Sequence, residues 1–263
     1  MIEVQTLSRT FGNVAAVRDV SFSVAPGELL VLVGGSGSGK TTTLKMINRL
    51  IEPDSGTVLI DGVNAATIAG HTLRRRIGYV FQKVGLFPHM TVAANIATPL
   101  RLIGEGQDRI RQRVADVLEL MELPASFGDR YPAELSGGEQ QRVGVARALA
   151  AEPRVMLLDE PFGALDPLTR DRLQQSFMAV RRRLGLTAVF VTHDMVEALL
   201  LADRIAVLHS GALVQVGTPA ELLRSPADEY VEQMLVTPRR QSRALDDLLA
   251  GGRPAQPQVR PTR

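Results

Sequence analysis

What this 263-residue chain lacks already narrows its class. It contains no cysteine, which excludes disulfide bonds and thiolate metal sites and is typical of a reducing compartment. No apolar run approaches the roughly 18 residues that span a membrane. The first residues, 1–5, alternate like a strand and do not resemble a signal peptide. We therefore expect an ordinary soluble globular protein with one or two domains and a sizeable core.

A strong excess of one charge sign is also missing from most of the chain. The net charge is +2, but residues 237–263 carry six arginines against two aspartates, so the rest has a net charge of −2. A slightly acidic body does not fit a nucleic-acid-binding protein, and we expect no nucleic-acid partner. The basic end could contact anionic lipid. Its composition favours a solvated, poorly ordered C-terminal tail over 237–263.

What the chain does contain is a glycine-rich loop of the pattern G-x-x-x-x-G-K-[ST]. The loop consists of Gly34, Gly35, Ser36, Gly37, Ser38, Gly39, Lys40, Thr41 and Thr42. An apolar run at 29–33 precedes it and helically spaced apolar residues follow to residue 50, which predicts a buried parallel strand, the loop and a helix. Glycines let the backbone N–H groups point at phosphates, and the helix start adds a positive end. Lys40 would reach the β- and γ-phosphates, and the Thr41 hydroxyl would ligate Mg²⁺.

Four further polar residues lie at the carboxyl ends of predicted strands. Asp159 and Glu160 end the apolar strand at 154–158, Gln82 ends the strand that begins at residue 76, and His193 follows the strand at 187–192. The carboxyl ends of strands are where open α/β sheets bind ligands. Taken alone, Glu160 could equally be a helix-capping carboxylate and His193 an ordinary strand-end histidine.

Two apolar features have two interpretations each. Phe11 lies in a predicted turn at 9–13 between strands at 2–7 and 16–24, where it either packs locally or stacks on a base. Leu86 and Phe87 lie in a loop broken by glycine and proline, before a helical pattern that runs from about residue 91 to 151. They either fold back on the core or dock a partner.

A second glycine-rich stretch lies at 135–142. Ser136 and Glu139 form a capping-box pattern that starts a helix. Gly137 and Gly138 weaken that helix by about 1 kcal/mol each, and their benefit would be a close approach of backbone N–H groups to an anion.

The chain resembles the ATP-binding-cassette (ABC) ATPases, because it carries their motifs in the same order. These are the loop at 34–42, Gln82, residues 135–142, residues 155–160, residues 163–166 and His193. The resemblance is to the stand-alone subunits of bacterial importers and covers about residues 2–236. It implies an α/β P-loop NTPase fold: a mostly parallel central sheet, an antiparallel β subdomain and a helical subdomain inserted at about 84–151. The domain would occupy residues 1–236, followed by the tail at 237–263.

The resemblance also implies how ATP and Mg²⁺ bind. Phe11 stands where an aromatic residue stacks on adenine; tyrosine is commoner there, and phenylalanine loses the hydroxyl. Asp159 would bind Mg²⁺ through water, with Thr41 and Gln82 as the other metal-site residues. The implied ATP-binding residues are Phe11, Gly34, Gly35, Ser36, Gly37, Ser38, Gly39, Lys40, Thr41, Thr42, Gln82 and Asp159.

The implied catalytic residues are Glu160, His193, Gln82 and Lys40. Glu160 would polarise the attacking water, and His193 would contact the γ-phosphate. Gln82 would sense Mg²⁺ and the γ-phosphate and link the site to the helical subdomain. These roles suit phosphoryl transfer, which depends on positioning and charge neutralisation more than on covalent chemistry.

Another group is implied to act on ATP bound to a second copy of the chain: Ser136, Gly137, Gly138, Gln140 and Asp166. Two chains would then sandwich two ATP molecules, and the Leu86–Phe87 region would pass the motion to an integral-membrane permease subunit. The implied location is peripheral, at the cytoplasmic face of the inner membrane, with an extracytoplasmic solute-binding protein as an indirect partner.

The stretches 77–82, 85–92 and 95–96 look most like the osmoprotectant branch, which imports glycine betaine, choline, carnitine or proline betaine. Importers of other small solutes such as amino acids share part of this pattern. The alternatives outside transport are an ABC ATPase of repair or translation and a different P-loop enzyme such as a kinase or GTPase. Repair ATPases carry a long coiled-coil insertion, translation ATPases usually carry two cassettes, and GTPases carry a guanine-reading motif. We find none of these three features in this sequence.

Overall fold

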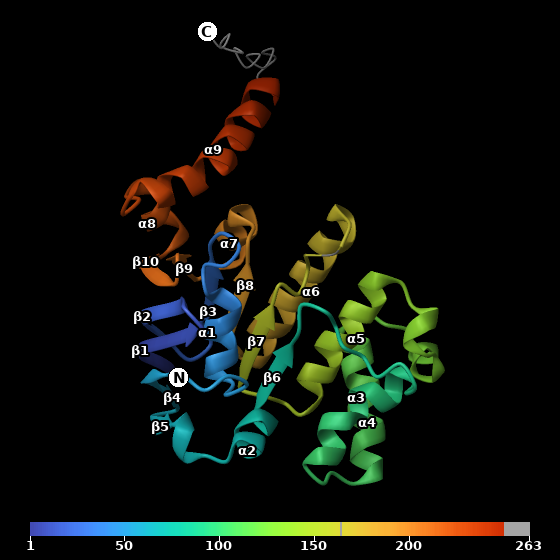
Figure 1. Ribbon diagram of the computed structural model, residues 1–263. Helices are drawn as coiled ribbons and strands as arrows, with labels where there is room; N and C mark the ends of the chain where they lie inside the picture. The colour runs from blue at the N-terminus through green and yellow to red at the C-terminus, as the bar shows by residue number, and fades with distance from the viewer. Residues whose placement is uncertain (164, 250–263) are drawn as a thin grey trace.

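The computed structural model of the chain describes residues 1–163 and 165–249, without the side chains of 245, 247 and 249. Its centre is a six-stranded sheet in the order β10-β9-β3-β8-β7-β6, shown in Figure 1. Within this sheet only β10 runs antiparallel to its neighbour. The strands are β3 (Leu29–Val33), β6 (Ile77–Val80), β7 (Val155–Asp159), β8 (Thr187–Thr192), β9 (Arg204–His209) and β10 (Ala212–Gly217).

A second, four-stranded antiparallel sheet has the order β2-β1-β4-β5. Its strands are β1 (Ile2–Phe11), β2 (Val14–Val24), β4 (Ser55–Ile60) and β5 (Val63–Asn64). The predicted turn at 9–13 is wrong in length: β1 pairs with β2 as far as Phe11 opposite Val14, so only Gly12 and Asn13 form the turn. A two-residue turn with Gly12 at positive φ continues the ladder to its end.

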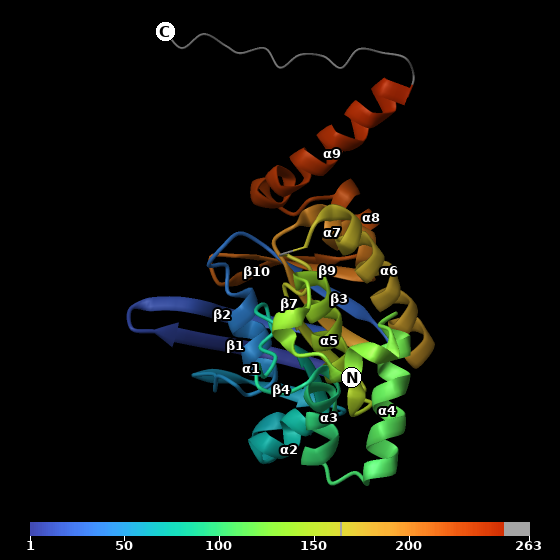
Figure 2. The same cartoon turned by 90° about the vertical axis from the view of Figure 1, so that its right-hand side faces the viewer.

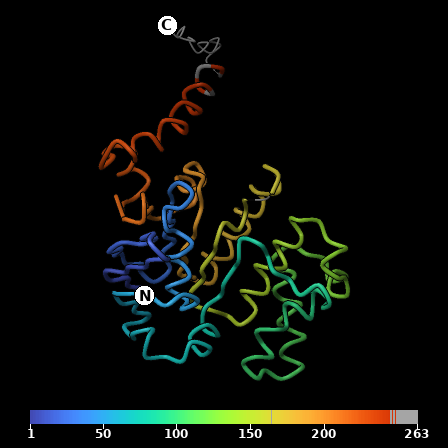
Figure 3. The backbone as a smooth tube through the Cα atoms, in the orientation of Figure 1, coloured from blue at the N-terminus to red at the C-terminus, as the bar shows by residue number. Residues whose placement is uncertain are grey.

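Nine α-helices connect and cover these sheets in the described part of the chain. They are α1 (Lys40–Ile47), α2 (Gly70–Arg75), α3 (Val92–Leu102), α4 (Gln107–Leu120), α5 (Gly137–Ala150), α6 (Pro167–Leu184), α7 (Met195–Leu201), α8 (Pro219–Arg224) and α9 (Glu229–Leu249). The chain leaves the sheet after β6 and returns at β7, and the segment between them forms a helical lobe around α3, α4 and α5 (Figures 1 and 3). None of the described helices is both long and apolar enough to cross a membrane.

The buried strand β3 divides the core into two parts. Leu29, Val31 and Val33 point to the core that the helices α3 to α7 share. Leu30 and Leu32 point to the core between α1 and the antiparallel sheet. Both faces of β3 are covered, which is why its sequence is a continuous apolar run. The predicted α/β fold, with a mostly parallel sheet, an antiparallel subdomain and an inserted helical subdomain, is confirmed.

The C-terminal helix α9 corrects the expectation of poor order for 237–249. It continues to Leu249 with Pro238 inside it, and it projects away from the sheets in Figures 1 and 2. Its first turns are held by the fully buried Val231 and Leu235, and the arginines, glutamine and leucines that follow are good helix formers. The rest of the expected tail, 250–263, lies outside the described residues.

Candidate functional site

Four neighbouring parallel strands deliver the predicted site residues to one edge of the sheet. The glycine-rich loop follows β3, and His193 follows β8 directly. Asp159 ends β7 and is followed by Glu160, and Gln82 comes two residues after β6. Because β3, β8, β7 and β6 are adjacent and parallel, their carboxyl ends meet at the same edge.

The glycine-rich loop is packed so closely that two of its glycines have no room for a side chain. A Cβ atom on Gly34 would lie 2.2 Å from the carbonyl oxygen of Leu208. A Cβ atom on Gly39, whose φ is +98°, would lie 2.4 Å from the carbonyl oxygen of Ala16. These glycines let the loop pass directly against β9 and β2, which fixes its curvature.

Lys40 closes the loop from inside. Its Nζ donates hydrogen bonds to the carbonyl oxygens of Gly34 and Gly35, both at 2.8 Å, and to Oγ of Ser38 at 3.3 Å. The residue is only 6% exposed. Burial lowers the pKa of Lys40, although the nearby carboxylates of Glu160 and Asp159 act in the opposite direction. The ammonium group therefore lies in the curve of the loop, where an anion would gain most from it.

Helix α1 starts in this loop without a side-chain cap. Its N-cap is Gly39, and among the described residues no side-chain cap accepts a hydrogen bond from the first turn. The first N–H groups of a helix have no partner within the helix, and they carry the positive end of its dipole. An uncapped helix start beside a buried ammonium group is an anion-binding arrangement.

Thr41 and Asp159 meet across the site. The Thr41 hydroxyl donates a hydrogen bond of 2.7 Å to Oδ1 of Asp159. Asp159 is 4% exposed, and burial raises its pKa despite the hydrogen bond from Thr41 and the positive charge of Lys45. A second cation near this carboxylate would offset the cost of its burial.

The Glu160 carboxylate is contacted by side chains that follow both neighbouring strands, β6 and β8. Nε2 of Gln82 donates to its Oε2 at 3.0 Å, and Nδ1 of His193 lies 3.4 Å from its Oε1. The Glu160 backbone has φ +45°, a left-handed conformation that costs a non-glycine residue about 1–2 kcal/mol. Its N–H group is held by the carbonyl oxygen of Val191 at 3.0 Å. The fold thus holds this carboxylate at the tip of β7, between the predicted Gln82 and His193.

Phe11 lies at the free end of β1 and is 44% exposed. The Arg9 guanidinium carbon lies 4.9 Å from its ring centroid. Its partner across the ladder is Val14, and further along the same strand Ala16 and Val17 are the residues that approach Gly39. The ring is therefore on the hairpin that borders the glycine-rich loop.

The residues expected to act across two chains lie together, apart from the glycine-rich loop. Ser136 caps α5, and its hydroxyl accepts from the N–H of Glu139 at 3.3 Å. A Cβ atom on Gly138 would lie 2.7 Å from Cγ2 of Thr169, the residue whose N–H is capped by Asp166. The start of α5 thus packs on the start of α6.

One face of this second cluster is open. Nothing lies within 4 Å of a Cβ atom built on Gly137. The side-chain amide of Gln140 is used locally, donating to the carbonyl oxygens of Pro132 and Leu135. Within the described residues no hydrogen bond joins 136–140 to 34–42, and Figure 1 shows β7 and β6 between α1 and α5.

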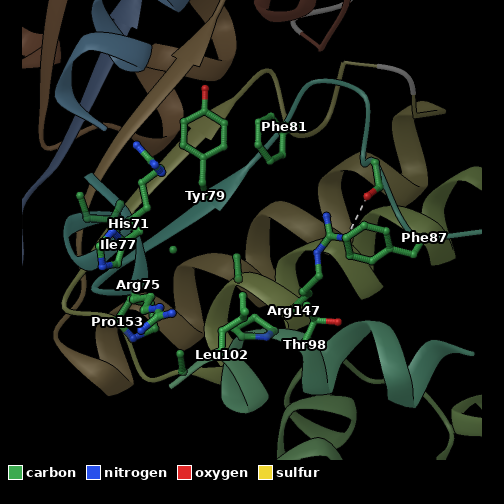
Figure 4. A pocket seen from close by; sticks show the side chains of 16 residues that line it. His71, Arg75, Ile77, Tyr79, Phe81, Phe87, Thr98, Leu102, Arg147 and Pro153 are labelled. Atoms are coloured by element: carbon green, nitrogen blue, oxygen red, sulfur yellow. Dashed lines mark hydrogen bonds between the residues drawn. The ribbon is translucent and has the colours of Figure 1, made fainter. Parts of the chain in front are cut away.

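Leu86 and Phe87 have different environments. Leu86 packs against the core, whereas Phe87 is 40% exposed and lines a cavity of about 430 Å³ between the sheet and the helical lobe. Figure 4 shows Tyr79 and Phe81 on one side of this cavity and Phe87 and Arg147 on the other. The sequence suggested Phe87, but it gave no signal for Arg147, which holds the loop through the carbonyl oxygens of Val84 and Gly85 at 2.8 and 2.9 Å.

Sequence reasoning also missed Tyr230, at the start of α9. Its hydroxyl accepts a hydrogen bond of 2.9 Å from the N–H of Gly35, inside the glycine-rich loop. No motif connects these two positions, which lie 195 residues apart. A prediction that β9 pairs with β3 would have revealed this contact, because that pairing brings the C-terminal segment to the loop.

Comparisons with known proteins agree with this geometry. The profile of the family described as ABC transporter matches residues 17–163. The chain is 52% identical over 236 residues to the glycine betaine/carnitine/choline transport ATP-binding protein OpuCA of Bacillus subtilis, a match that covers 89% of this chain and 62% of that relative. The chain therefore spans less than two thirds of the length of OpuCA.

A second sequence relative and a solved structure also resemble the chain. The chain is 50% identical over 233 residues to the glycine betaine uptake system ATP-binding protein YehX of Escherichia coli, covering 89% of this chain and 76% of that one. The dimeric post-hydrolysis structure of the ATP-binding cassette MJ0796, bound to ADP and Pi, matches with a TM-score of 0.77 at 33% identity. That match covers 83% of this chain and 99% of the cassette.

Proposed function

The chain belongs to the ABC transporter family, and from this premise we propose that it is the ATP-hydrolysing subunit of an importer for osmoprotectants. The observation that carries the proposal is the convergence of the glycine-rich loop, His193, the Asp159–Glu160 pair and Gln82 at one edge of four adjacent strands. Relatives at 50–52% identity that are named for glycine betaine, carnitine or choline transport support the cargo class.

The loop at 34–42 suits the phosphates of ATP. The uncapped start of α1 offers N–H groups and a positive dipole end. The Lys40 ammonium has three donors, now placed on Gly34, Gly35 and Ser38, and it would redirect them to the β- and γ-phosphates. Phe11 would provide the stacking surface for adenine from the neighbouring hairpin.

The residues present also fit Mg²⁺. The ion usually keeps several waters and binds through one or two carboxylates together with substrate phosphates. The paired oxygens of Thr41 and Asp159 match this chemistry, and the raised pKa of Asp159 marks a buried carboxylate that a cation would favour. Thr41, Asp159 and Gln82 would hold Mg²⁺, which supplies positive charge against the phosphates when bound.

Glu160 would orient the attacking water. Its carboxylate is held by Gln82 on one oxygen and faces His193 with the other, so it is positioned from two strands at once. Gln82 donates a hydrogen bond without removing the negative charge, which leaves the carboxylate able to accept a proton from water as the bond to phosphorus forms. His193 would contact the γ-phosphate from the adjacent strand end.

A second copy of the chain would complete the site. The start of α5 presents the Ser136 hydroxyl and the open Gly137, with Asp166 on the adjoining α6. This surface is separate from the loop of its own chain, so it is free to face the γ-phosphate held by a partner. Gly138 and Gln140 would support this contact, Gln140 by holding the segment before the helix. The dimeric form of the MJ0796 cassette supports this arrangement.

The cavity beside Phe87 would receive a cytoplasmic helix of a membrane permease subunit. Its walls combine the apolar Phe87 and Leu102 with the basic His71, Arg75 and Arg147, which suits an apolar helix that carries acidic residues. The protein would then lie peripherally at the cytoplasmic face of the inner membrane. A solute-binding protein outside the membrane would deliver the cargo to the permease.

Two measurements test this function. The variant Glu160→Gln should bind Mg-ATP but lose turnover, and it should elute as an ATP-dependent dimer in gel filtration. Glu119→Gln, the same charge change on the exposed side of α4, should behave like the parent protein. Uptake of labelled glycine betaine, choline, carnitine and proline betaine in cells with and without the gene then tests the cargo. Uptake of a labelled amino acid alone would replace the osmoprotectant assignment, and a Glu160→Gln protein that remains monomeric with ATP would contradict the sandwich.

A further inference from the structure

The outer side of the glycine-rich loop is held by the C-terminal part of the domain. The turn between β9 and β10 contributes the N–H of Gly211, which donates to the carbonyl oxygen of Ser38 at 3.2 Å. The carbonyl oxygen of Gly211 in turn accepts from the N–H of Arg18 at 2.7 Å, which ties the turn to β2. The turn between β9 and β10 therefore braces the loop at Ser38 and joins it to β2.

Tyr230 provides a second brace, from another element. Its hydroxyl accepts the 2.9 Å hydrogen bond from the N–H of Gly35. Its ring stacks on the ring of His209 with a centroid distance of 3.8 Å and an interplanar angle of 4°. His209 ends β9, so the tyrosine is oriented by the sheet as well as by its own helix.

The backbone that carries Tyr230 is itself fixed. The next residue, Val231, is fully buried, and its N–H donates to Oδ1 of Asp228 at 2.9 Å. Leu235, one helical turn further on, is also fully buried. The hydroxyl is therefore presented by an anchored helix start and not by a freely moving side chain.

Gly35 is thus held at both of its polar backbone groups. Tyr230 holds the N–H group, and Lys40 holds the carbonyl oxygen. If Lys40 turns to phosphates, as in the proposed function, the carbonyl oxygen of Gly35 keeps only the N–H of Ser38, at 3.3 Å, while the Tyr230 contact stays. Tyr230 then restrains this part of the loop while the lysine changes partners.

We propose that Tyr230 is a positioning residue for nucleotide binding, which holds the glycine-rich loop in its phosphate-accepting curve through the N–H of Gly35. This inference rests on the proposed ATP-binding function and adds to it a residue from the C-terminal helix. The restraint matters most before phosphates arrive, because bound phosphates order the loop themselves. The effect therefore falls on nucleotide affinity and much less on turnover at saturation.

The test is the variant Tyr230→Phe, which removes the hydroxyl and keeps the ring that stacks on His209. Loss of one neutral hydrogen bond predicts that Kd for Mg-ATP and for Mg-ADP, and KM for ATP, rise about 2- to 10-fold. The kcat is expected to stay within about 2-fold of the parent value. Ser242→Ala, which removes an exposed hydroxyl from the same helix, is the matched control and should change none of these values.

A double-mutant cycle separates this contact from a general effect of the helix. Gly35→Pro removes the N–H group, and within the described residues the one atom less than 4 Å from a Cβ built on Gly35 is the Tyr230 hydroxyl oxygen, at 3.5 Å. In that background, Tyr230→Phe should cost no further affinity. Gly35→Ala retains the N–H, so Tyr230→Phe should keep its full effect there. If Gly35→Pro does not fold, the result rests on Tyr230→Phe in the parent and in Gly35→Ala.

Two outcomes would overturn the inference. The first is unchanged nucleotide affinity in a folded Tyr230→Phe protein, including the case in which only its melting temperature falls. The second is an equal loss of affinity with and without the N–H of Gly35. Failure of the parent protein to bind Mg-ATP would instead refute the proposed function, so the two ideas fail in different ways.

Discussion

Asp159→Asn is expected to stabilise the nucleotide-free protein. Asp159 is buried, and its hydrogen bond from the Thr41 hydroxyl needs only an acceptor, which the asparagine side chain retains. Burial raises the pKa of Asp159, so the folded protein holds a carboxylate that would prefer water. Removing that charge should add roughly 0.5–2 kcal/mol, the usual range of one stabilising substitution. For a domain of this size this is a rise in Tm of about 1–8 °C.

The sign of the pH dependence follows from the raised pKa. Well below the ordinary pKa of 3.8, Asp159 is protonated in both the folded and the unfolded chain, so parent and variant should have similar Tm values. As the pH rises through the pKa of the folded protein, the parent loses stability relative to Asp159→Asn. The difference in Tm should therefore grow from acid to neutral pH.

Glu221→Gln is a matched control with the opposite sign. Hydrogen bonds from the backbone and side chain of Thr218 lower the pKa of Glu221, which lies on α8. Its carboxylate therefore stabilises the fold at neutral pH, and this advantage disappears as the pH falls through the lowered pKa. The control variant should be less stable than the parent at neutral pH and should respond normally to nucleotide.

The Asp159→Asn variant also tests the proposed metal role of Asp159. Mg-ATP at about 100 times its Kd should stabilise the parent by about 2.7 kcal/mol, and Asp159→Asn should lose most of this gain. Differential scanning calorimetry from acid to neutral pH, with and without Mg-ATP, measures both effects. A lower Tm of the nucleotide-free variant, a pH-independent difference or a full Mg-ATP shift would refute the reasoning.

Three other substitutions have defined outcomes. Lys40→Ala removes charged hydrogen bonds worth about 1.5–3 kcal/mol to phosphate and should raise the Kd for ATP roughly 10- to 150-fold in calorimetric titration; unchanged affinity would contradict its role. Gly34→Ala places a Cβ atom 2.2 Å from the Leu208 carbonyl oxygen and should cost about 1–3 kcal/mol in urea unfolding; an unshifted midpoint would show that the loop can move aside. Phe11→Ala should weaken ATP and ADP binding alike, by the roughly 1–3 kcal/mol of a base-stacking contact, while Phe11→Tyr keeps the affinity; an affinity change with Phe11→Tyr as large as with Phe11→Ala would contradict stacking.

Local sequence was sufficient where a residue's role depends on its own neighbours. The loop at 34–42 was predictable because its glycines allow the tight curve and close backbone approach that phosphates need, with a lysine and a threonine at the fixed spacing of the motif. The strands that carry Asp159 and His193 were predictable because both faces of a central parallel strand are buried, which requires an apolar run. The capping box of Ser136 and Glu139 was visible for the same local reason.

Sequence was insufficient where distant segments decide the outcome. The turn at 9–13 was placed too early because the ladder of β1 and β2 extends the strand to Phe11. Residues 237–249 were expected to be poorly ordered, yet α9 begins on buried anchors upstream and continues through them. The contact of Tyr230 with Gly35 depends on the order of the strands, which no single segment encodes.

The short connection after β6 limits how far the helical lobe can shift without breaking the contact between Gln82 and Glu160. Gln82 is bonded to Glu160, and only two residues later the carbonyl oxygen of Val84 is gripped by Arg147 of α5. Val84 is also wedged against α5, since a Cβ atom on Gly144 would lie 2.5 Å from its Cγ1. Two residues of fully extended chain reach about 7 Å, so this tether has little slack. A swing of the lobe beyond this slack would pull Gln82 away from the Glu160 carboxylate, so under the proposed function hydrolysis would depend on the position of the lobe.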